Sequence, residues 1–180
     1  MSWALVALGA LGAIAVVAGV SVAIGSTLPR DHVATVRARF SAGPAAVWAV
    51  IDDPLSAATW RRDVKKVVAL PDRDGLKSWS EETGNGAVTY VLVGSEPPRA
   101  MTTRIADDAL PFGGQWEYVL QASQQGSELT ITERGFVKPA LFRFMARYVF
   151  GYTSTMQDYL VALGVKLGER TTPEVVSTGR

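Results

Sequence analysis

Residues 139–169 carry an apolar stripe that indicates a long amphipathic helix near the end of the chain. The stripe consists of side chains at steps of three and four: Phe142, Met145, Val149, Tyr152, Met156, Leu160, Leu163 and Leu167. This spacing puts them on one face of a helix, while Arg143 and Arg147 would lie on the opposite, polar face. About 30 residues at 1.5 Å each would make a rod of roughly 45 Å. Such a rod needs a large cover over its apolar face, and we expect the strands upstream to supply it.

Gly151 is the position at which the predicted helix would kink. Phe144 and Phe150, which both precede this glycine, lie off the apolar stripe. Both observations point to a break in the helix at Gly151.

Residues 3–24 form a second apolar run, without charge or proline, and the apolar character continues to Leu28. Twenty-odd residues are enough for a helix that spans a bilayer. A secretory signal peptide is the alternative, with a weak cleavage site at Ala23-Ile24-Gly25. However, no Lys or Arg precedes the run, and the run is longer than a usual signal core. We therefore expect residues 1–29 to be a single-pass membrane anchor.

The charges that flank this run bear on topology. Arg30, Arg37 and Arg39 follow it, so the positive-inside rule favours a cytoplasmic C-terminal domain. Cleavage would instead give a secreted or periplasmic protein. Ala15 and Gly19 form a small-xxx-small pair, but in a segment so rich in Ala and Gly the pair does not indicate dimerisation. The oligomeric state stays open.

The charged and metal-binding residues exclude several classes of function. Eighteen basic and 17 acidic side chains nearly cancel, so nothing argues for nucleic acid as a partner. The sequence has no cysteine and one histidine, His32, so we expect neither a disulfide nor a metal site, and no cofactor. His32 follows the apolar run directly, where we expect it to be solvated or to face lipid headgroups.

The stretch between the two apolar segments predicts an α+β domain. Turn signals, above all residues 71–75 and Asn85-Gly86, divide it into short strands. Six consecutive strands with short turns predict an antiparallel meander that covers the long helix, and residues 170–180 look like a disordered polar tail. The helix-grip domain would then span residues 30–169. The predicted elements are a strand at 32–40, short helices at 43–51 and 55–60, and strands at 63–70, 76–83, 87–95, 100–107, 112–122 and 127–137.

Several short motifs occur in the same order as these elements. They are Gly43-Pro44-Ala45-Ala46-Val47-Trp48, Asp53-Pro54 with Trp60, Gly114-Gln115-Trp116-Glu117-Tyr118, Thr130-Ile131-Thr132-Glu133-Arg134-Gly135, Phe142-Arg143-Phe144, Gly151-Tyr152 and Asp158-Tyr159-Leu160. In these motifs, over residues 32–169, the chain resembles the START/Bet v 1-like (SRPBCC) superfamily, and within it the bacterial polyketide cyclase/dehydrase and lipid-transport proteins. The resemblance implies a helix-grip fold with an apolar cavity between the sheet and the long helix. It also implies that such a protein binds lipids, sterols, quinones, hormones or polyketides, and that only some members catalyse a reaction.

Large side chains at alternating strand positions would face the long helix and line such a cavity. They could equally fill the space as packed core. Methionine and tyrosine favour the cavity slightly, because one adapts its shape and the other brings a hydroxyl. Trp60 matches a recurring tryptophan of the family near the cavity entrance, although it could also be a buried staple between helix and strand. The other predicted lining residues are Tyr90, Leu92, Met101, Trp116, Tyr118, Leu120, Met145, Tyr152, Met156 and Leu160.

Glu133 is the acidic residue with the strongest functional case. It alternates with Leu129 and Ile131, so a regular strand would aim it at the inner face of the sheet. A buried carboxylate must be paired or neutralised, and it could hydrogen-bond a ligand or act as an acid. The alternative is a structural role in a pair with an arginine such as Arg104 or Arg143.

Two classes of function follow from these features. In the first, a membrane-anchored domain binds an apolar small molecule that is lipid-like, isoprenoid-like or polyketide-like. In the second, the same cavity positions a polyketide-like substrate for cyclisation or dehydration, with proximity supplying most of the effect. The lack of an obvious acid/base pair favours binding over catalysis. A third possibility is a membrane-anchored interaction domain whose core is filled.

Overall fold

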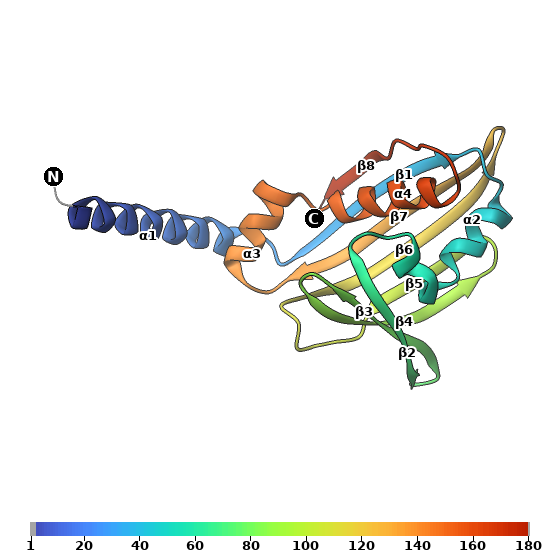
Figure 1. Cartoon of the computed structure of the whole chain (residues 1–180), viewed down its shortest axis with the longest axis horizontal. Coiled ribbons are helices and arrows are strands. Elements are labelled where there is room, and N and C mark those ends of the chain that lie inside the picture. Colours follow the sequence, from blue (N-terminus) through green and yellow to red (C-terminus); the bar gives the residue numbers. More distant parts are fainter. Residues whose placement is uncertain (1–2, 180) are drawn as a thin grey trace.

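The computed structural model describes residues 3–179, in which an antiparallel sheet curls around one helix and a long N-terminal helix projects away (Figure 1). The helices are α1 (Trp3–Thr27), α2 (Pro44–Ile51), the 3₁₀ helix η1 (Pro54–Thr59), α3 (Ala140–Met145), the π-helix η2 (Ala146–Phe150) and α4 (Ser154–Lys166). The strands are β1 (Asp31–Phe40), β2 (Val64–Arg73), β3 (Leu76–Thr83), β4 (Gly86–Glu96), β5 (Ala100–Ile105), β6 (Phe112–Ser123), β7 (Gly126–Val137) and β8 (Glu174–Gly179).

The predicted meander is confirmed. The sheet has eight strands in the order β2-β3-β4-β5-β6-β7-β1-β8, and consecutive strands from β2 to β7 pair antiparallel. The turn between β2 and β3 is tighter than expected: β2 continues through Pro71 to Arg73, leaving Asp74 and Gly75 as the turn. Both have positive φ, 52° and 77°, as a two-residue type I′ hairpin turn requires.

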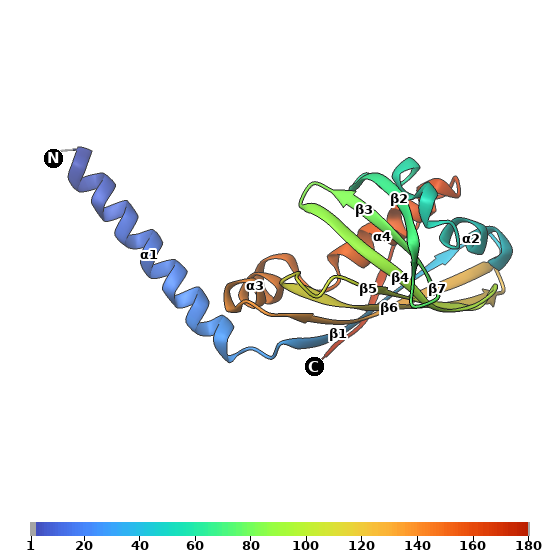
Figure 2. The same cartoon turned by 90° about the horizontal axis from the view of Figure 1, so that it is seen from below.

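The core lies between the inner face of β1, β6 and β7 and the inward face of α4. Alternate residues of β1 and β7 are fully buried, among them Val36 and Ile131, as strands with one covered face require. On α4, Met156, Leu160 and Leu163 are also fully buried. Figure 2 shows α4 in the hollow of the curved sheet, with α2 beside it at one end. This arrangement is the helix-grip fold that the sequence predicts.

The covering helix is much shorter than the predicted rod. The chain breaks at Gly151, whose φ of 77° and ψ of 157° lie in a region open essentially to glycine alone. The kink expected at this glycine is therefore a complete break, and α4 covers the sheet with 13 residues. The first half of the stripe does not face the sheet, because Phe142 and Val149 are 49% and 56% exposed.

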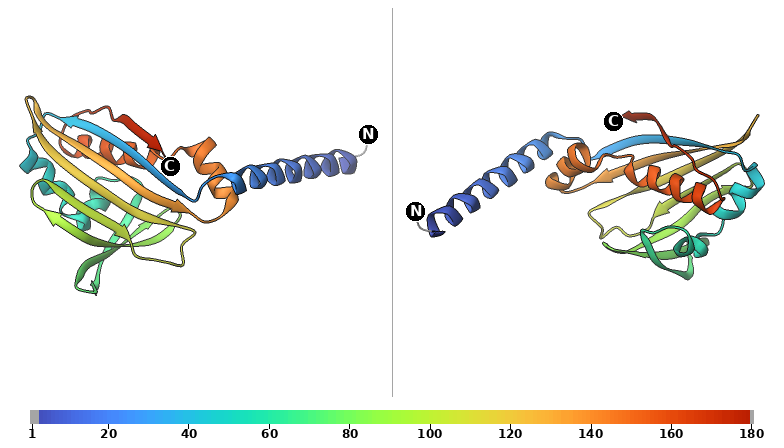
Figure 3. Two further views of the ribbon diagram at one scale, coloured as in Figure 1. Left: turned by 180° about the vertical axis from the view of Figure 1, so that it is seen from behind. Right: turned by 45° about the horizontal axis from the view of Figure 1, so that its top comes forward.

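Residues 174–179 are not part of a disordered tail, as was predicted for residues 170–180, and Arg180 lies outside the described residues. Residues 174–179 form β8, which pairs antiparallel with β1 and covers its outer edge. Figure 3 shows β8 running along β1 after the chain has turned back from the end of α4. An uncovered β1 would expose a row of unpaired backbone groups, and β8 supplies their partners.

Helix α1 stands apart from the sheet (Figure 2). It has 25 residues, about 37 Å at 1.5 Å each, and a 22-residue part, Val6–Thr27, is long and apolar enough to cross a membrane. A signal sequence near the N-terminus would pass the same test. Apolar side chains such as Leu11, Val16 and Val20 are more than half exposed, so water is an unfavourable surrounding for this helix.

Candidate functional site

A cavity of about 410 Å³ opens between the sheet and the helices η1 and α4. Its wall combines the inner faces of strands β2 to β6 with the end of α2, η1 and the first turns of α4. The lining residues are Val50, Ile51, Asp52, Asp53, Pro54, Leu55, Ala57, Trp60, Arg61, Ala69, Leu70, Asp72, Lys77, Ser78, Trp79, Glu81, Tyr90, Leu92, Met101, Thr103, Trp116, Tyr118, Thr155 and Tyr159.

Half of the predicted site residues lie in this wall: Trp60, Tyr90, Leu92, Met101, Trp116 and Tyr118. All except Trp60 come from strand positions that alternate toward the helix. The ring of Tyr159 lies among three of the aromatic rings, with centroid distances of 5.3 Å to Trp60, 5.7 Å to Trp116 and 5.9 Å to Tyr118. Edge-to-face and tilted contacts at these distances stabilise aromatic clusters. The cavity therefore has a rigid aromatic floor.

The other predicted lining residues lie outside the cavity. Leu120, Met156 and Leu160 are buried in the packed core, so for them the core alternative holds. Met145 ends α3, which does not cover the sheet. Tyr152 packs at the margin of the core, where its ring stacks on His32 with centroids 4.2 Å apart. Met145 and Tyr152 lie outside the cavity because the helix breaks at Gly151, so no continuous helix holds them over the sheet.

Glu133 faces the inner side of the sheet as predicted. The alternative, that Glu133 pairs with an arginine such as Arg104 or Arg143, is wrong. Glu133 Oε1 accepts a hydrogen bond from His32 Nε2 at 2.9 Å, and its Oε2 accepts one from Trp116 Nε1 at 2.7 Å. The expected partner Arg143 is instead buried against α1, where its Nε donates to the backbone oxygen of Gly25. Glu133 therefore holds the Trp116 ring of the cavity wall from the neighbouring strand β7.

His32 is not solvated as predicted, because only 7% of it is exposed. It is the second residue of β1 and lies on the same face as Ala34 and Val36. The alternation of the strand thus directs it inward, where it bonds Glu133.

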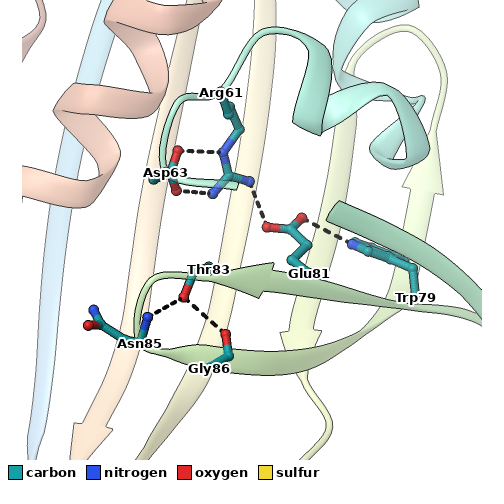
Figure 4. Close-up of polar contacts among 7 residues, drawn as sticks. All are labelled: Arg61, Asp63, Trp79, Glu81, Thr83, Asn85 and Gly86. Carbon is teal, nitrogen blue, oxygen red and sulfur yellow. Dashed lines mark hydrogen bonds and ion pairs between the residues drawn. The ribbon is translucent and has the colours of Figure 1, made fainter. Parts of the chain in front are cut away.

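A charged network that the sequence analysis missed lies in the cavity wall (Figure 4). Arg61 binds Asp63 through Nε and Nη2, at 3.3 and 2.6 Å, and its Nη1 donates to Glu81 Oε2 at 2.8 Å. Glu81 Oε1 accepts a hydrogen bond from Trp79 Nε1 at 3.1 Å. The side chains of Arg61 and Glu81 are 12% and 7% exposed. Both oxygens of Glu81 are thus engaged, as a buried carboxylate requires.

The protonation states of the wall follow from burial and charge. Burial alone would lower the pKa of the Arg61 guanidinium, but its hydrogen bonds to Asp63 and the nearby charge of Glu81 outweigh burial and raise this pKa. Burial also raises the pKa of the Tyr90, Tyr118 and Tyr159 hydroxyls above their usual value. At neutral pH the cavity wall therefore holds the Arg61 cation, paired with Asp63 and Glu81, and protonated phenols, which can donate hydrogen bonds.

Signals for the missed residues were present in the sequence. Glu81 alternates with Trp79 on one strand, which is the same pattern that singled out Glu133. Tyr159 is three residues after Met156, so it lies on the inner face of α4 once the helix starts after Gly151. Arg61 lies in the turn after η1, where local sequence gives no indication of burial.

Comparison with known families decides the classification. The sequence profile of the family described as polyketide cyclase / dehydrase and lipid transport matches residues 31–161, well over half of the chain. The chain belongs to this family. A comparison with curated proteins finds no match.

Solved structures of similar fold superpose on most of the sheet domain. The Zhui aromatase/cyclase from Streptomyces sp. R1128 is 19% identical with a TM-score of 0.56, covering 75% of this chain and 90% of that one. A protein from Mesorhizobium loti is 16% identical with a TM-score of 0.57, covering 76% and 96%. The di-domain ARO/CYC StfQ from the steffimycin biosynthetic pathway is 12% identical with a TM-score of 0.57, covering 76% and 52%. This chain therefore spans about half the length of StfQ, and these likenesses establish the START/Bet v 1-like fold.

Proposed function

We propose that this polyketide cyclase/dehydrase and lipid transport family member is a membrane-anchored domain that binds an apolar or aromatic small molecule in the cavity. The single observation that carries the proposal is the cavity of about 410 Å³, with its aromatic floor and one fixed arginine. Ligand sites are mostly apolar hollows of about 300–1,000 Å³ with a few placed polar groups. An unfilled space of this size argues against an interaction domain with a filled core.

The polar groups of the wall narrow the ligand class. Arg61 and the tyrosine hydroxyls are hydrogen-bond donors, so they suit a ligand that carries carbonyl or carboxylate oxygens at one end. The rings of Trp60, Trp116 and Tyr159 suit a flat or ring-containing body. A lipid acid, an isoprenoid quinone and a polyketide all combine these two parts.

Anchoring by α1 is the second part of the proposal. Its support is the length of the helix and the exposure of its apolar side chains all around. Arg30, Arg37 and Arg39 follow the helix, which favours a cytoplasmic sheet domain. Such a tether would hold the cavity near a bilayer, where apolar ligands are concentrated.

Binding without turnover is favoured over catalysis by the state of the acidic groups. Among the acidic residues of the lining, Glu81 has both oxygens engaged, and Asp52, Asp53 and Asp72 are exposed to solvent. Glu133 lies beside Trp116 on the neighbouring strand and is not part of the lining. Cyclisation or dehydration of a polyketide needs a group that removes a proton from carbon, and the buried phenols stay protonated. The alternative function is enzymatic cyclisation or dehydration, since two of the solved structures of similar fold are aromatase/cyclases. It predicts that the full chain converts a poly-β-ketone substrate and that Tyr118→Phe abolishes conversion.

A cavity-filling variant tests the binding proposal. Thr103 lies in the wall on the inner face of β5, and Thr102 is its neighbour on the opposite face. We expect Thr103→Trp in the full chain to lower affinity for an environment-sensitive fluorescent fatty acid at least tenfold, because the indole occupies the ligand's space. Thr102→Trp, the matched control, should bind like the wild type.

Equal binding by both variants and the wild type would overturn the proposal, since the probe would then bind outside the cavity. The melting temperatures of the two variants, measured in parallel, show that the fold survives each substitution.

A further inference from the structure

The segment that should have extended the covering helix instead presents apolar side chains to solvent. We call residues 140–150, which comprise α3 and η2, the α3–η2 segment. Its large exposed side chains are Leu141 (38%), Phe142 (49%), Tyr148 (59%), Val149 (56%) and Phe150 (64%). So much exposed apolar surface in eleven consecutive residues marks a contact with another apolar phase or protein.

The α3–η2 segment is packed against α1. Ser21 and Gly25, one helical turn apart, are buried although the surrounding α1 side chains are exposed. A Cβ on Gly25 would come within 1.9 Å of the backbone oxygen of Ala140, so only glycine permits this approach. Arg143 Nε also donates to the oxygen of Gly25 at 2.9 Å. The contact therefore fixes α3 beside the last two turns of α1 (Figure 1).

The position of this contact along α1 sets the depth at which the α3–η2 segment would lie in a bilayer crossed by α1. Ser21 and Gly25 both lie inside the apolar stretch Val6–Thr27. From Thr27 back to Ser21 the helix descends about 9 Å. Amphipathic segments that lie in a membrane interface bury their apolar face by about 5–10 Å. If α1 crosses a bilayer, α3 is thus held at the level of the headgroups and upper acyl chains.

The charges of this region suit an anionic lipid surface. Lys138, Arg143 and Arg147 are the charged side chains between residues 138 and 157, and the stretch has no acidic residue. Basic side chains next to a membrane helix are attracted by anionic lipids. Arg143, the deepest of the three, donates to the backbone oxygens of Gly25 and Lys138, so its guanidinium has partners where water is scarce.

We propose that the α3–η2 segment is a second membrane contact, immersed in the leaflet next to the sheet domain with Phe142, Val149 and Phe150 among the acyl chains. The inference rests on the proposed anchoring by α1 and goes beyond it. With α1 as the only membrane contact, the sheet domain could change its orientation freely. A second contact fixes the orientation of the sheet domain on the bilayer.

Depth-dependent quenching tests the proposal on the full chain. The sequence has no cysteine, so single-cysteine variants can carry one NBD fluorophore each. Phe150→Cys reports on the α3–η2 segment, Val16→Cys on the middle of α1, and Val68→Cys, 42% exposed on the edge strand β2, is the control. The labelled chains are reconstituted into vesicles of phosphatidylcholine and phosphatidylglycerol that contain lipids with a nitroxide high on the acyl chain.

The expected result is blue-shifted emission and strong nitroxide quenching at residue 150, with neither effect at residue 68. Quenching at residue 16 by a deeper nitroxide would show separately that α1 is inserted. An inserted α1 with an unquenched residue 150 overturns the second contact and leaves the anchor standing. A blue shift at residue 150 without nitroxide quenching also overturns it, because protein, such as a second copy of the chain, would then cover the segment. Quenching at residue 150 without insertion of α1 would support the lipid contact and overturn the anchor.

Discussion

At the scale of single residues, strand alternation predicted which way a side chain points but not what it contacts. The inward orientation of Glu133 follows from its register with Leu129 and Ile131, and the structure confirms it. Its partner His32 lies 101 residues earlier in β1, and its partner Trp116 lies 17 residues earlier in the neighbouring strand β6. Only tertiary pairing brings them together, so the expected arginine partner was wrong for a reason that no local pattern could reveal.

Glu169 allows a prediction about pH at this scale. Its carboxylate accepts hydrogen bonds from the Ser41 hydroxyl and from the backbone N–H groups of Ser41 and Ala42. Partial burial raises the pKa of Glu169, but these hydrogen bonds outweigh burial and lower it. A carboxyl with a lower pKa in the folded state adds stability above its unfolded pKa, and this stability is lost as pH falls through the folded pKa.

We therefore expect Glu169→Gln to lower the free energy of unfolding at pH 7 by about 1 kcal/mol or less, since solvent screens this carboxylate. The difference from the wild type should vanish as the pH falls below the folded pKa of Glu169. Denaturant melts between neutral and acidic pH measure it, with Glu96→Gln at an exposed site as the control. A difference that stays constant with pH would contradict the assignment.

At the scale of elements, the sequence predicted seven strands and both short helices because each is bounded by its own turn residues. The prediction of one long helix was wrong because the apolar stripe continues across Gly151, whereas the helical backbone conformation ends there. Phe144 and Phe150, off the stripe, were the local sign that two separate faces were present. Strand β8 was missed because its partner β1 lies more than a hundred residues earlier, and a polar terminal segment alone does not indicate pairing.

The break at Gly151 gives a prediction at the element scale. An alanine there would hold φ and ψ values that suit glycine alone, so we expect Gly151→Ala to cost about 1–3 kcal/mol of stability. Gly94→Ala is the matched control, because a Cβ at Gly94 meets nothing within 4 Å and its φ is not positive. Chemical denaturation of both variants measures the difference. Equal stabilities would mean that the break does not depend on the glycine.

At the scale of the whole molecule, the order of elements and the family motifs predicted the helix-grip fold. They did not predict how much of the interior is open, because a cavity and a packed core have the same pattern of inward apolar residues. Leu120, Met156 and Leu160 became core, whereas Tyr90, Met101 and Tyr118 line the cavity. The fit between the curved sheet and a short α4 decides between these outcomes, and this fit is a property of the assembled fold.

Native mass spectrometry of the full chain, purified from membranes in mild detergent, tests the central claim most directly. The account predicts a mass that includes residues 1–29 and a population of wild-type chains that carry an additional small apolar molecule. Thr103→Trp should lose this molecule while Thr102→Trp keeps it, because only the first fills the cavity. A wild-type chain that carries no such molecule, or a molecule retained equally by both variants, would contradict the claim that the cavity is the binding site.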